Sequence, residues 1–210
     1  FLGPNGAGKS TTIRLMCGVL QLDFGTVKIC GHDITTSELH AQSCFGYLPE
    51  AAAGFGNLTV REFLTYCGEC RAVWGEPLKS AIEKTTDLID LRPALDQEIR
   101  KLSKGWRQRA WLAQSILHDP PVLILDEPTD GLDPNQKDKI NDLIRQKKVD
   151  KTIILSTHIL EEVEEVCDRV LLIANGSIVA DDTPENLVQE FGSLSKAFRT
   201  LTTNEPIPQG

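Results

Sequence analysis

Apolar residues follow two different spacings along the chain, and each spacing predicts one kind of element. Residues 122–126 ("VLILD") and 152–157 ("TIILST") are apolar runs, as expected for parallel strands that are buried on both faces. Residues 11–20 carry apolar side chains on one side of a helix, and residues 158–168 form a second helix with acids near its start. Strands and helices therefore alternate, which predicts an α/β fold with a mostly parallel sheet.

Short strands and turns complete this core. Residues 25–31 and 44–49 are predicted strands bounded by glycine and proline. Asn175 and Gly176 form the turn of a predicted hairpin near the end of the chain, and a final helix follows that hairpin.

The segment between residues 51 and 105 interrupts the alternation, because its pattern is helical and predicts no strand. Thr59 and Glu62 form a capping box that starts a helix through about Trp74, and a second helix follows over about 78–90. No clear pattern continues beyond about Ser193. We therefore expect a core made of residues 1–50 and 106–192, an inserted helical subdomain over 51–105, and a C-terminal tail over 193–210.

Composition narrows the class of protein. The 210 residues are 40% hydrophobic and 25% charged, which is typical of a globular domain, and the net charge of −8 argues against a nucleic-acid partner. No apolar run reaches the ~18–20 residues that cross a bilayer, so the chain is expected to have no membrane span of its own. The chain begins without Met directly before a glycine-rich loop, from which we expect an incomplete sequence.

The 6 cysteines and the histidines outside the motifs give little indication of chemistry. Only Cys67 and Cys70 share a CxxC spacing, and no second pair completes a zinc site. We expect reduced thiols of the kind found in the cytosol. His32, His40 and His118 have no chemical context and are expected at the surface.

Residues 3–10 ("GPNGAGKS") fit the phosphate-loop pattern G-x-x-x-x-G-K-[ST]. Glycines let backbone N–H groups turn toward an anion, and the start of the following helix adds its dipole. Lys9 is expected to reach the β- and γ-phosphates, Ser10 to supply a hydroxyl to Mg²⁺, and Thr11 to reach an α-phosphate oxygen. The expected nucleotide contacts of the loop are Gly3, Pro4, Asn5, Gly6, Ala7, Gly8, Lys9, Ser10 and Thr11.

Two acids follow one buried strand, at the sheet edge where α/β proteins bind ligands. Asp126 is expected to hold Mg²⁺, and Glu127 to orient and deprotonate the attacking water. His158 follows the next buried strand, where its imidazole can hydrogen-bond the γ-phosphate and Glu127. The candidate catalytic residues are therefore Glu127, His158 and Lys9.

These elements predict a P-loop nucleoside triphosphatase but do not select its kind. A GTPase would need a base-reading NKxD sequence, and the chain has none. A small-molecule kinase would need a lid with clustered arginines, whereas Arg61, Arg71, Arg92 and Arg100 are spread along the helical segment. The stretch "LSKGWRQR" that ends this segment discriminates among the remaining classes.

With "VLILDEPTDGLDP" closely after it, this stretch resembles the signature of ABC-type ATP-binding subunits, which reads LSGGQ followed by a basic-Gln-Arg helix. Leu102, Ser103 and Gly105 match that signature, whereas Lys104 and Trp106 depart from it. The resemblance runs from the phosphate loop into the final helix, in the family's order and spacing. It implies a RecA-like P-loop ATPase core that uses ATP and Mg²⁺.

The resemblance also implies partners. Family members bind ATP head to tail between two subunits, so Ser103 and Gly105 would contact the nucleotide of a second ATP-binding subunit, identical or different. Asp133 would reach across the same seam, and His158 would sense the γ-phosphate. A membrane-embedded permease is implied as well, and it would dock on the apolar residues Gly54, Phe55, Gly56 and Leu58.

Glu50 stands where the family usually has Gln. Its carboxylate can ligate Mg²⁺ beside Ser10 and Asp126, so Glu50 is expected as a metal ligand and a contact in the nucleotide site. Because a carboxylate also repels the γ-phosphate, turnover or metal preference is expected to differ. "GYLPE…LTVREFL" together with "SKGWRQR" is similar to the export branch, which includes gliding-motility and multidrug ATPases. The resemblance thus implies a cytoplasmic exporter subunit, held at the inner face of the cell membrane by its permease.

An alternative is a non-transport ABC ATPase that acts on ribosomes or DNA. Such proteins usually carry a second cassette with a charged linker, or a long inserted coiled coil, and this chain shows neither.

The family's adenine-stacking aromatic residue lies on a strand upstream of the phosphate loop. A chain that starts at Phe1 is therefore expected to fold marginally and to bind ATP poorly.

Overall fold

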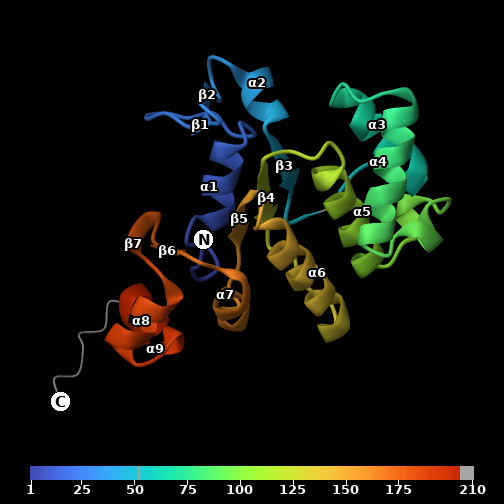
Figure 1. The fold of residues 1–210 in the computed structure, drawn as a ribbon. Helices are drawn as coiled ribbons and strands as arrows, with labels where there is room; N and C mark the ends of the chain where they lie inside the picture. The colour runs from blue at the N-terminus through green and yellow to red at the C-terminus, as the bar shows by residue number, and fades with distance from the viewer. Residues whose placement is uncertain (52, 204–210) are drawn as a thin grey trace.

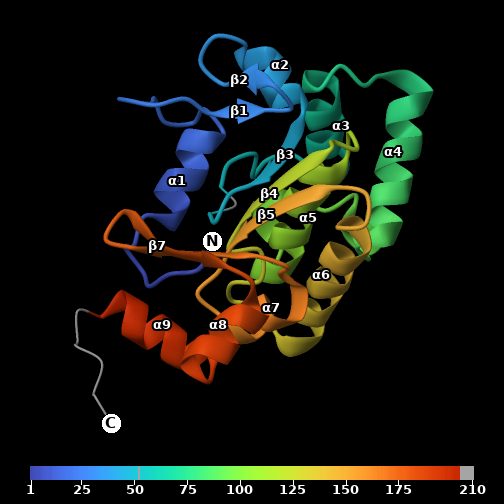
Figure 2. The same ribbon diagram turned by 60° about the vertical axis from the view of Figure 1, so that its left-hand side comes forward.

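A computed structural model describes residues 1–51 and 53–203, and a parallel sheet forms its centre. Strand β4 (Val122–Asp126) lies between β3 (Phe45–Leu48) and β5 (Thr152–Ser156) and pairs in parallel with both. Figure 2 shows these strands side by side. The predicted α/β class and its mostly parallel sheet are confirmed.

Leu2 continues the sheet past β5. It forms parallel bridges with Thr157, just after β5, and with Leu172 of the next strand. That strand, β6 (Val170–Ala174), pairs antiparallel with β7 (Ser177–Asp182), and the predicted Asn-Gly turn joins them. The residue before the phosphate loop is thus held between two strands.

Helices cover both faces of the sheet (Figure 1). Ile124 of β4 packs on one side with Ile13 of α1 (Lys9–Met16). Leu123 and Leu125 pack on the other side with α5 (Lys104–Ile116) and α6 (Pro134–Lys147). Because neighbouring side chains of a strand point to opposite faces, burial of both explains the unbroken apolar run of β4.

The predicted strand over residues 25–31 is wrong in length. Only β1 (Lys28–Ile29) is extended, and it pairs with β2 (His32–Asp33). Cys30 and Gly31 take φ values of 50° and 83°, which turn the chain at once. Helix α2 (Glu38–Ser43) follows this small hairpin.

The segment after β3 is helical, as predicted. Its elements are α3 (Val60–Cys70), α4 (Gly75–Leu88) and the short 3₁₀ turns Arg92–Ala94 and Ile99–Lys101. The predicted capping box of α3 is present, since Thr59 N donates to Glu62 Oε2 at 2.8 Å and Glu62 N donates to Thr59 Oγ1 at 3.2 Å. Helix α3 ends at Cys70 rather than at Trp74, because Ala72 has a left-handed φ of 59°.

The prediction of a tail from residue 193 is wrong for the residues that the structure describes. After α8 (Pro184–Phe191), Ser193 caps α9 (Leu194–Thr202) by accepting a hydrogen bond from Lys196 N at 3.2 Å. Leu194 and Ala197 of this helix are buried in a small core with Leu172. Figure 1 places α7 (Leu160–Val166), α8 and α9 at the end of the molecule away from α3 and α4. Residues 204–210 of the predicted tail and residue 52 lie outside the described residues.

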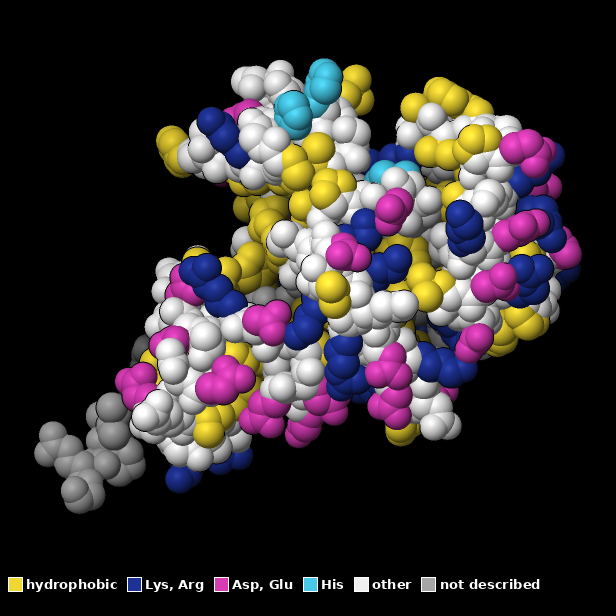
Figure 3. All heavy atoms as spheres, in the orientation of Figure 1, with side chains coloured by type: hydrophobic (Ala, Val, Ile, Leu, Met, Phe, Trp, Pro, Cys, Tyr) yellow, Lys and Arg dark blue, Asp and Glu magenta, His cyan; other side chains and the backbone are white. Residues whose placement is uncertain are grey.

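Charged side chains of both signs share the surface. Figure 3 shows acidic and basic residues interspersed over the face that carries α4, α5 and α6. Several of them form exposed ion pairs, such as Arg145 with Asp142 at 2.7 Å and Lys148 with Asp168 at 2.8 Å. Across residues 1–51 and 53–203, no helix has the length and apolarity needed to cross a membrane.

The prediction that His118 lies at the surface is wrong. Its side chain is half-buried, and its Nε2 lies 3.3 Å from the carbonyl oxygen of Phe45. Burial first, and then the nearby Arg71 guanidinium, lower the pKa of His118 to about 4, so the ring is neutral at physiological pH. Cys67 of the CxxC pair is also partly buried, and burial raises the pKa of its thiol to about 12, which makes it unreactive.

Candidate functional site

The phosphate loop lies between Leu2 and the start of α1. Gly6 and Gly8 have φ values of 79° and 109°, which only glycine adopts without strain. The loop also rests on the β6–β7 turn, because Gly176 N donates to Ala7 O at 2.9 Å. A Cβ added at Gly3 would come within 2.3 Å of a backbone oxygen of β6, so this glycine is needed for close packing.

Lys9 lies across the loop and is only 6% exposed. Its Nζ donates to Gly3 O at 2.8 Å and to Pro4 O at 3.3 Å, and lies 3.6 Å from Glu127 Oε1. The buried ammonium is therefore surrounded by oxygen atoms, at a position where a bound triphosphate would add phosphate oxygens.

Oxygen donors from several elements meet beside the start of α1. Ser10 Oγ lies 3.0 Å from Asp126 Oδ1 and 3.3 Å from Glu50 Oε2. Ser156 Oγ also donates to Asp126 Oδ1, at 2.6 Å. The other carboxylate oxygen of Asp126 is buried and has no hydrogen-bond partner among the described residues.

This donor set fits Mg²⁺. Mg²⁺ prefers oxygen ligands and is usually held by one or two carboxylates together with phosphate oxygens and water. In the described part of the chain, no group of three or more His, Cys, Asp or Glu side chains could hold a metal by itself. Ser10, Asp126 and Glu50 would therefore share the ion with a bound triphosphate rather than form a closed cage.

Glu127 and His158 contact each other at the same edge of the sheet. His158 Nδ1 lies 2.9 Å from Glu127 Oε2, and the Glu127 side chain is 8% exposed whereas that of His158 is 42% exposed. Glu127 has a left-handed φ of 49°, and its N–H donates to Ser156 Oγ at 3.0 Å. Such a φ is costly for a side chain other than glycine, and such conformations concentrate at functional sites.

The signature residues form a second group, away from the contacts of the phosphate loop. Ser103 caps α5 by accepting a hydrogen bond from Trp106 N at 3.4 Å, and Asp133 caps α6 in the same way with Gln136 N at 3.0 Å. Gly105 lies against Gln136, since an added Cβ would come within 2.1 Å of Gln136 Oε1. The structure therefore brings Ser103, Gly105 and Asp133 together through the starts of α5 and α6.

Both departures from the family signature have partners within the chain. Lys104 Nζ donates to Asp130 Oδ2 at 2.8 Å, and this ion pair lowers the pKa of the Asp130 carboxyl. The Arg109 guanidinium stacks 4.3 Å from the centre of the Trp106 ring. Lys104 thus links the signature to the loop that follows Glu127.

Sequence reasoning missed several residues that organise the site. Ser156 holds Asp126 and Glu127 together, as described above. Buried Gln108 donates from Nε2 to Pro128 O at 3.2 Å, and buried Glu162 accepts hydroxyl hydrogen bonds from two threonines. Ser156 is the last residue of β5, so the strand pattern could have placed it at the edge of the sheet beside Asp126. Nothing in the local pattern marks Gln108 or Glu162 as buried.

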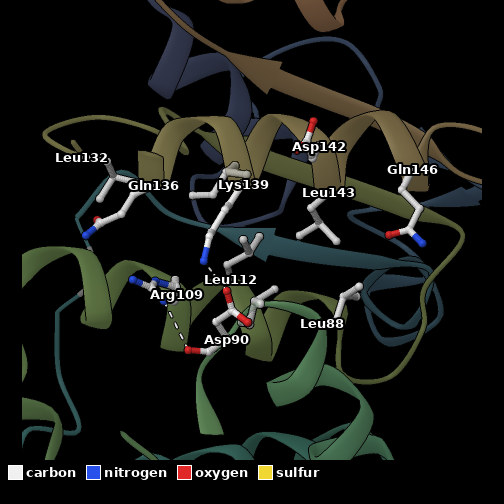
Figure 4. Close-up of a pocket in the computed structure, with 12 residues that line it drawn as sticks. Leu88, Asp90, Arg109, Leu112, Leu132, Gln136, Lys139, Asp142, Leu143 and Gln146 are labelled. Atoms are coloured by element: carbon white, nitrogen blue, oxygen red, sulfur yellow. Dashed lines mark hydrogen bonds and ion pairs between the residues drawn. The ribbon is translucent and has the colours of Figure 1, made fainter. Parts of the chain in front are cut away.

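A cavity of about 210 Å³ lies elsewhere, between α5, α6 and the turn after α4 (Figure 4). Leu132 and Gln136 line one end, and Lys139 donates to the Asp90 carboxylate across it. Arg109 Nη1 also donates to Asp90 O at 3.3 Å. The cavity contains none of the phosphate-loop residues, so it is separate from the nucleotide site.

Comparisons with known proteins agree with this geometry. A family model described as ABC transporter matches residues 1–130. The uncharacterized ABC transporter ATP-binding protein YxlF of Bacillus subtilis is 37% identical over 178 residues, which are 85% of this chain and 59% of that protein. Nod factor export ATP-binding protein I of Ralstonia nicotianae is 35% identical over 211 residues, covering 96% of this chain and 66% of the relative. The chain thus spans less than two thirds of the length of these relatives.

A solved structure agrees as well. It is described as the structure of the ATP binding subunit of an ABC transporter, and it matches with a TM-score of 0.88 and 29% sequence identity over 96% of this chain and 86% of that one. Motif order, fold and sequence match together show that the chain belongs to the ABC transporter family, whose ATP-binding domains are ATPases coupled to transport.

Proposed function

We propose that this chain is the ATP-binding and ATP-hydrolysing part of an ABC exporter, and that it works as a dimer on a separate membrane permease. The observation that supports this most is the cluster of Lys9, Ser10, Asp126, Glu127 and His158 at the end of the phosphate loop, in which Lys9 pairs with Glu127, Ser10 bonds Asp126 and His158 bonds Glu127. Within this cluster, Lys9 supplies a cation, Asp126 supplies a carboxylate suited to Mg²⁺, and Glu127 supplies a buried base.

The loop and Lys9 would hold the triphosphate. Lys9 would exchange its contacts with Gly3 O and Pro4 O for β- and γ-phosphate oxygens, because an ammonium binds an anion more strongly than a neutral carbonyl. Thr11, in the first turn of α1, would reach the α-phosphate. Mg²⁺ held by Ser10, Asp126 and Glu50 would supply charge neutralisation along the phosphates.

Glu127 would act as the general base. A water between its carboxylate and the γ-phosphate would form the new oxygen–phosphorus bond, its proton would pass to Glu127, and the bond to the β-phosphate oxygen would break. His158 would donate to Glu127 or to the γ-phosphate, and so orient the base.

The second group of residues would serve a partner's nucleotide. Ser103 and Gly105 at the start of α5 combine a hydroxyl with free backbone N–H groups and the positive end of a helix dipole. Asp133 lies exposed at the start of α6, the helix whose Gln136 lies against Gly105. The division into a core of residues 1–50 and 106–192 and a helical subdomain over 51–105 belongs to this proposal, with α9 added to the core because Leu194 and Ala197 pack with Leu172.

Nucleotide binding is tested by replacing Lys9. Lys9→Met removes the ammonium but keeps most of the apolar stem, and we expect ATP to bind about 10- to 100-fold more weakly, the loss typical of a hydrogen bond to a charged group. Isothermal titration with MgATP measures the change. Lys28→Met, at an exposed position in β1, is the matched control. Equal ATP affinity in parent and Lys9→Met would contradict the assignment of the phosphate loop.

An aromatic surface beside the helical segment would receive the permease. Phe55 is 40% exposed, and its ring lies 5.2 Å from Phe63, 5.4 Å from Tyr66 and 6.2 Å from Trp111. Exposed aromatic groups of this kind are typical of protein interfaces. The similarity to Nod factor export ATP-binding proteins supports an export role, and docking would place the protein at the inner face of the membrane.

Phe55→Asp is expected to weaken permease binding by about tenfold or more, because it places a charge at the centre of an apolar interface. Co-purification of the tagged permease with each variant measures this. Trp74→Asp is the control, since Trp74 is 60% exposed in the same helical segment but lies at the start of α4. Unchanged capture of the permease by Phe55→Asp would count against this surface.

A further inference from the structure

One buried carboxylate has no part in the chemistry proposed above. Glu162 belongs to α7 and is 5% exposed. Thr129 donates its hydroxyl hydrogen to Glu162 Oε1, and Thr157 donates to Oε2 at 2.7 Å. Both threonines are buried, with 2% and 1% exposure, and the Lys137 ammonium lies 4.0 Å from Oε1.

The two threonines belong to the two segments that carry the base and its histidine. Thr129 follows Glu127 by two residues, and Thr157 directly precedes His158. Thr157 Oγ1 also accepts a hydrogen bond from Ile159 N at 3.0 Å, so it shapes the turn that presents His158. Glu162 therefore connects these two segments through buried contacts in the protein interior.

Packing alone does not explain a charge at this position. Burying a carboxylate is costly, and well-packed apolar residues of similar volume are often as stable as a buried charged pair. Two short hydroxyl contacts, one to each oxygen, instead fix the distance between the two segments. That distance matters because the contact between His158 Nδ1 and Glu127 Oε2 spans only 2.9 Å and joins two different loops.

We propose that Glu162 is a positioning residue that holds the Glu127 and His158 segments at the spacing at which the base and the histidine are hydrogen-bonded. Glu162 itself touches no substrate, and it acts only through the hydroxyls of Thr129 and Thr157. This proposal rests on the proposed function, because it needs Glu127 and His158 to take part in ATP hydrolysis.

The first test compares two substitutions of Glu162 in purified protein. Glu162→Ala is expected to lower kcat for MgATP by about 10- to 100-fold, the usual loss when a supporting hydrogen bond behind a site is removed. KM and ATP affinity should change less than about twofold, because the phosphate loop is untouched. Glu162→Gln should restore most of the rate, since its amide has the same shape and a threonine hydroxyl can turn to accept from its N–H.

The second test changes the threonine, and it holds even where Glu162→Ala does not fold. Thr157→Val keeps the shape of the side chain but removes the hydroxyl, whereas Thr157→Ser keeps the hydroxyl. We expect Val to lower kcat and Ser to stay near the parent. In Thr157→Val the NMR signals of the His158 ring should also move, because the ring loses its fixed place beside Glu127.

A neighbouring acid on the same helix provides the control. Glu165 is exposed and links α7 to α6 through Arg145 at 3.2 Å and Asn141 at 3.0 Å. Glu165→Ala removes two contacts that involve neither the Glu127 segment nor the His158 segment, so kcat and the NMR signals of the His158 ring should stay unchanged.

The outcomes separate this proposal from the proposed function. If Glu162→Ala and Thr157→Val unfold at lower temperature but keep the kcat of the parent and its His158 ring signals, Glu162 serves stability alone and the proposal is overturned. If the parent hydrolyses no MgATP, or Glu127→Gln is as fast as the parent, the proposed function itself fails. A lower kcat with unchanged KM, rescued by Gln and Ser, supports the positioning role.

Discussion

Replacing Glu127 by Gln is expected to lower ATP hydrolysis by about 10²- to 10⁴-fold at saturating MgATP, because an amide cannot accept the proton of the attacking water. The substitution keeps the size of a side chain that is only 8% exposed, and its carbonyl oxygen can still face His158 Nδ1. The strained backbone at Glu127, with φ 49°, does not depend on the charge. The fold and ATP binding should therefore survive.

Two measurements check this expectation. Phosphate release at saturating MgATP gives the rate, and size-exclusion chromatography with ATP shows whether an ATP-bound dimer accumulates. Glu161→Gln makes the same chemical change at an exposed position in the first turn of α7, and it should hydrolyse ATP like the parent. Normal hydrolysis by Glu127→Gln would remove Glu127 as the base.

Ser103→Arg is expected to abolish hydrolysis that depends on the dimer, with a fall of about 100-fold or more, because it removes a group proposed to bind the partner's γ-phosphate and places a bulky cation in the seam. Its ATP affinity as a monomer should stay close to that of the parent. The Ser103 hydroxyl contacts Trp106 N and no residue of the phosphate loop in the described structure. The lost helix cap should cost about 1 kcal/mol of stability.

The dependence of phosphate release on protein concentration tests this second expectation, together with ATP titration at low concentration. Ser193→Arg is the matched control, because Ser193 caps α9 with the same geometry, accepting from Lys196 N at 3.2 Å, at a place remote from α5. A dimer that still hydrolyses ATP in Ser103→Arg would exclude the signature from the second half of the site.

The parts of the site that the sequence predicts are those that depend on local spacing. Lys9 and Ser10 follow a glycine pattern that strongly restricts the backbone conformation of the loop, and Gly6 and Gly8 have the left-handed φ values that it requires. Asp126, Glu127 and His158 end neighbouring parallel strands, and the ends of such strands meet at one edge. The order of the strands alone therefore predicts that these three side chains lie close together.

Other features depend on packing between distant segments. Glu162 looks like one of four acids in "LEEVEEV", and its contacts with Thr129 after β4 and Thr157 after β5 set it apart from the other three. The sequence predicts His118 at the surface, because the contact with Phe45 of β3 comes from a segment far away in the sequence. Helix α9 is different, since Leu194, Ala197, Phe198 and Leu201 do have helical spacing. That signal was present in the sequence and could have been recognised.

The tight turn of the last hairpin has a practical consequence. Gly176 donates to Ala7 O at 2.9 Å, and a Cβ on Gly8 would lie only 3.6 Å from Gly176 Cα. An Asn-Gly hairpin tip is normally a tolerant place to insert a tag, a fluorophore or a cleavage site. In this protein such an insertion would push on the nucleotide loop itself, so labels are better attached to the turn that leads into α4, where Trp74 is exposed; Figure 1 shows α4 well apart from α1, the helix that follows the phosphate loop.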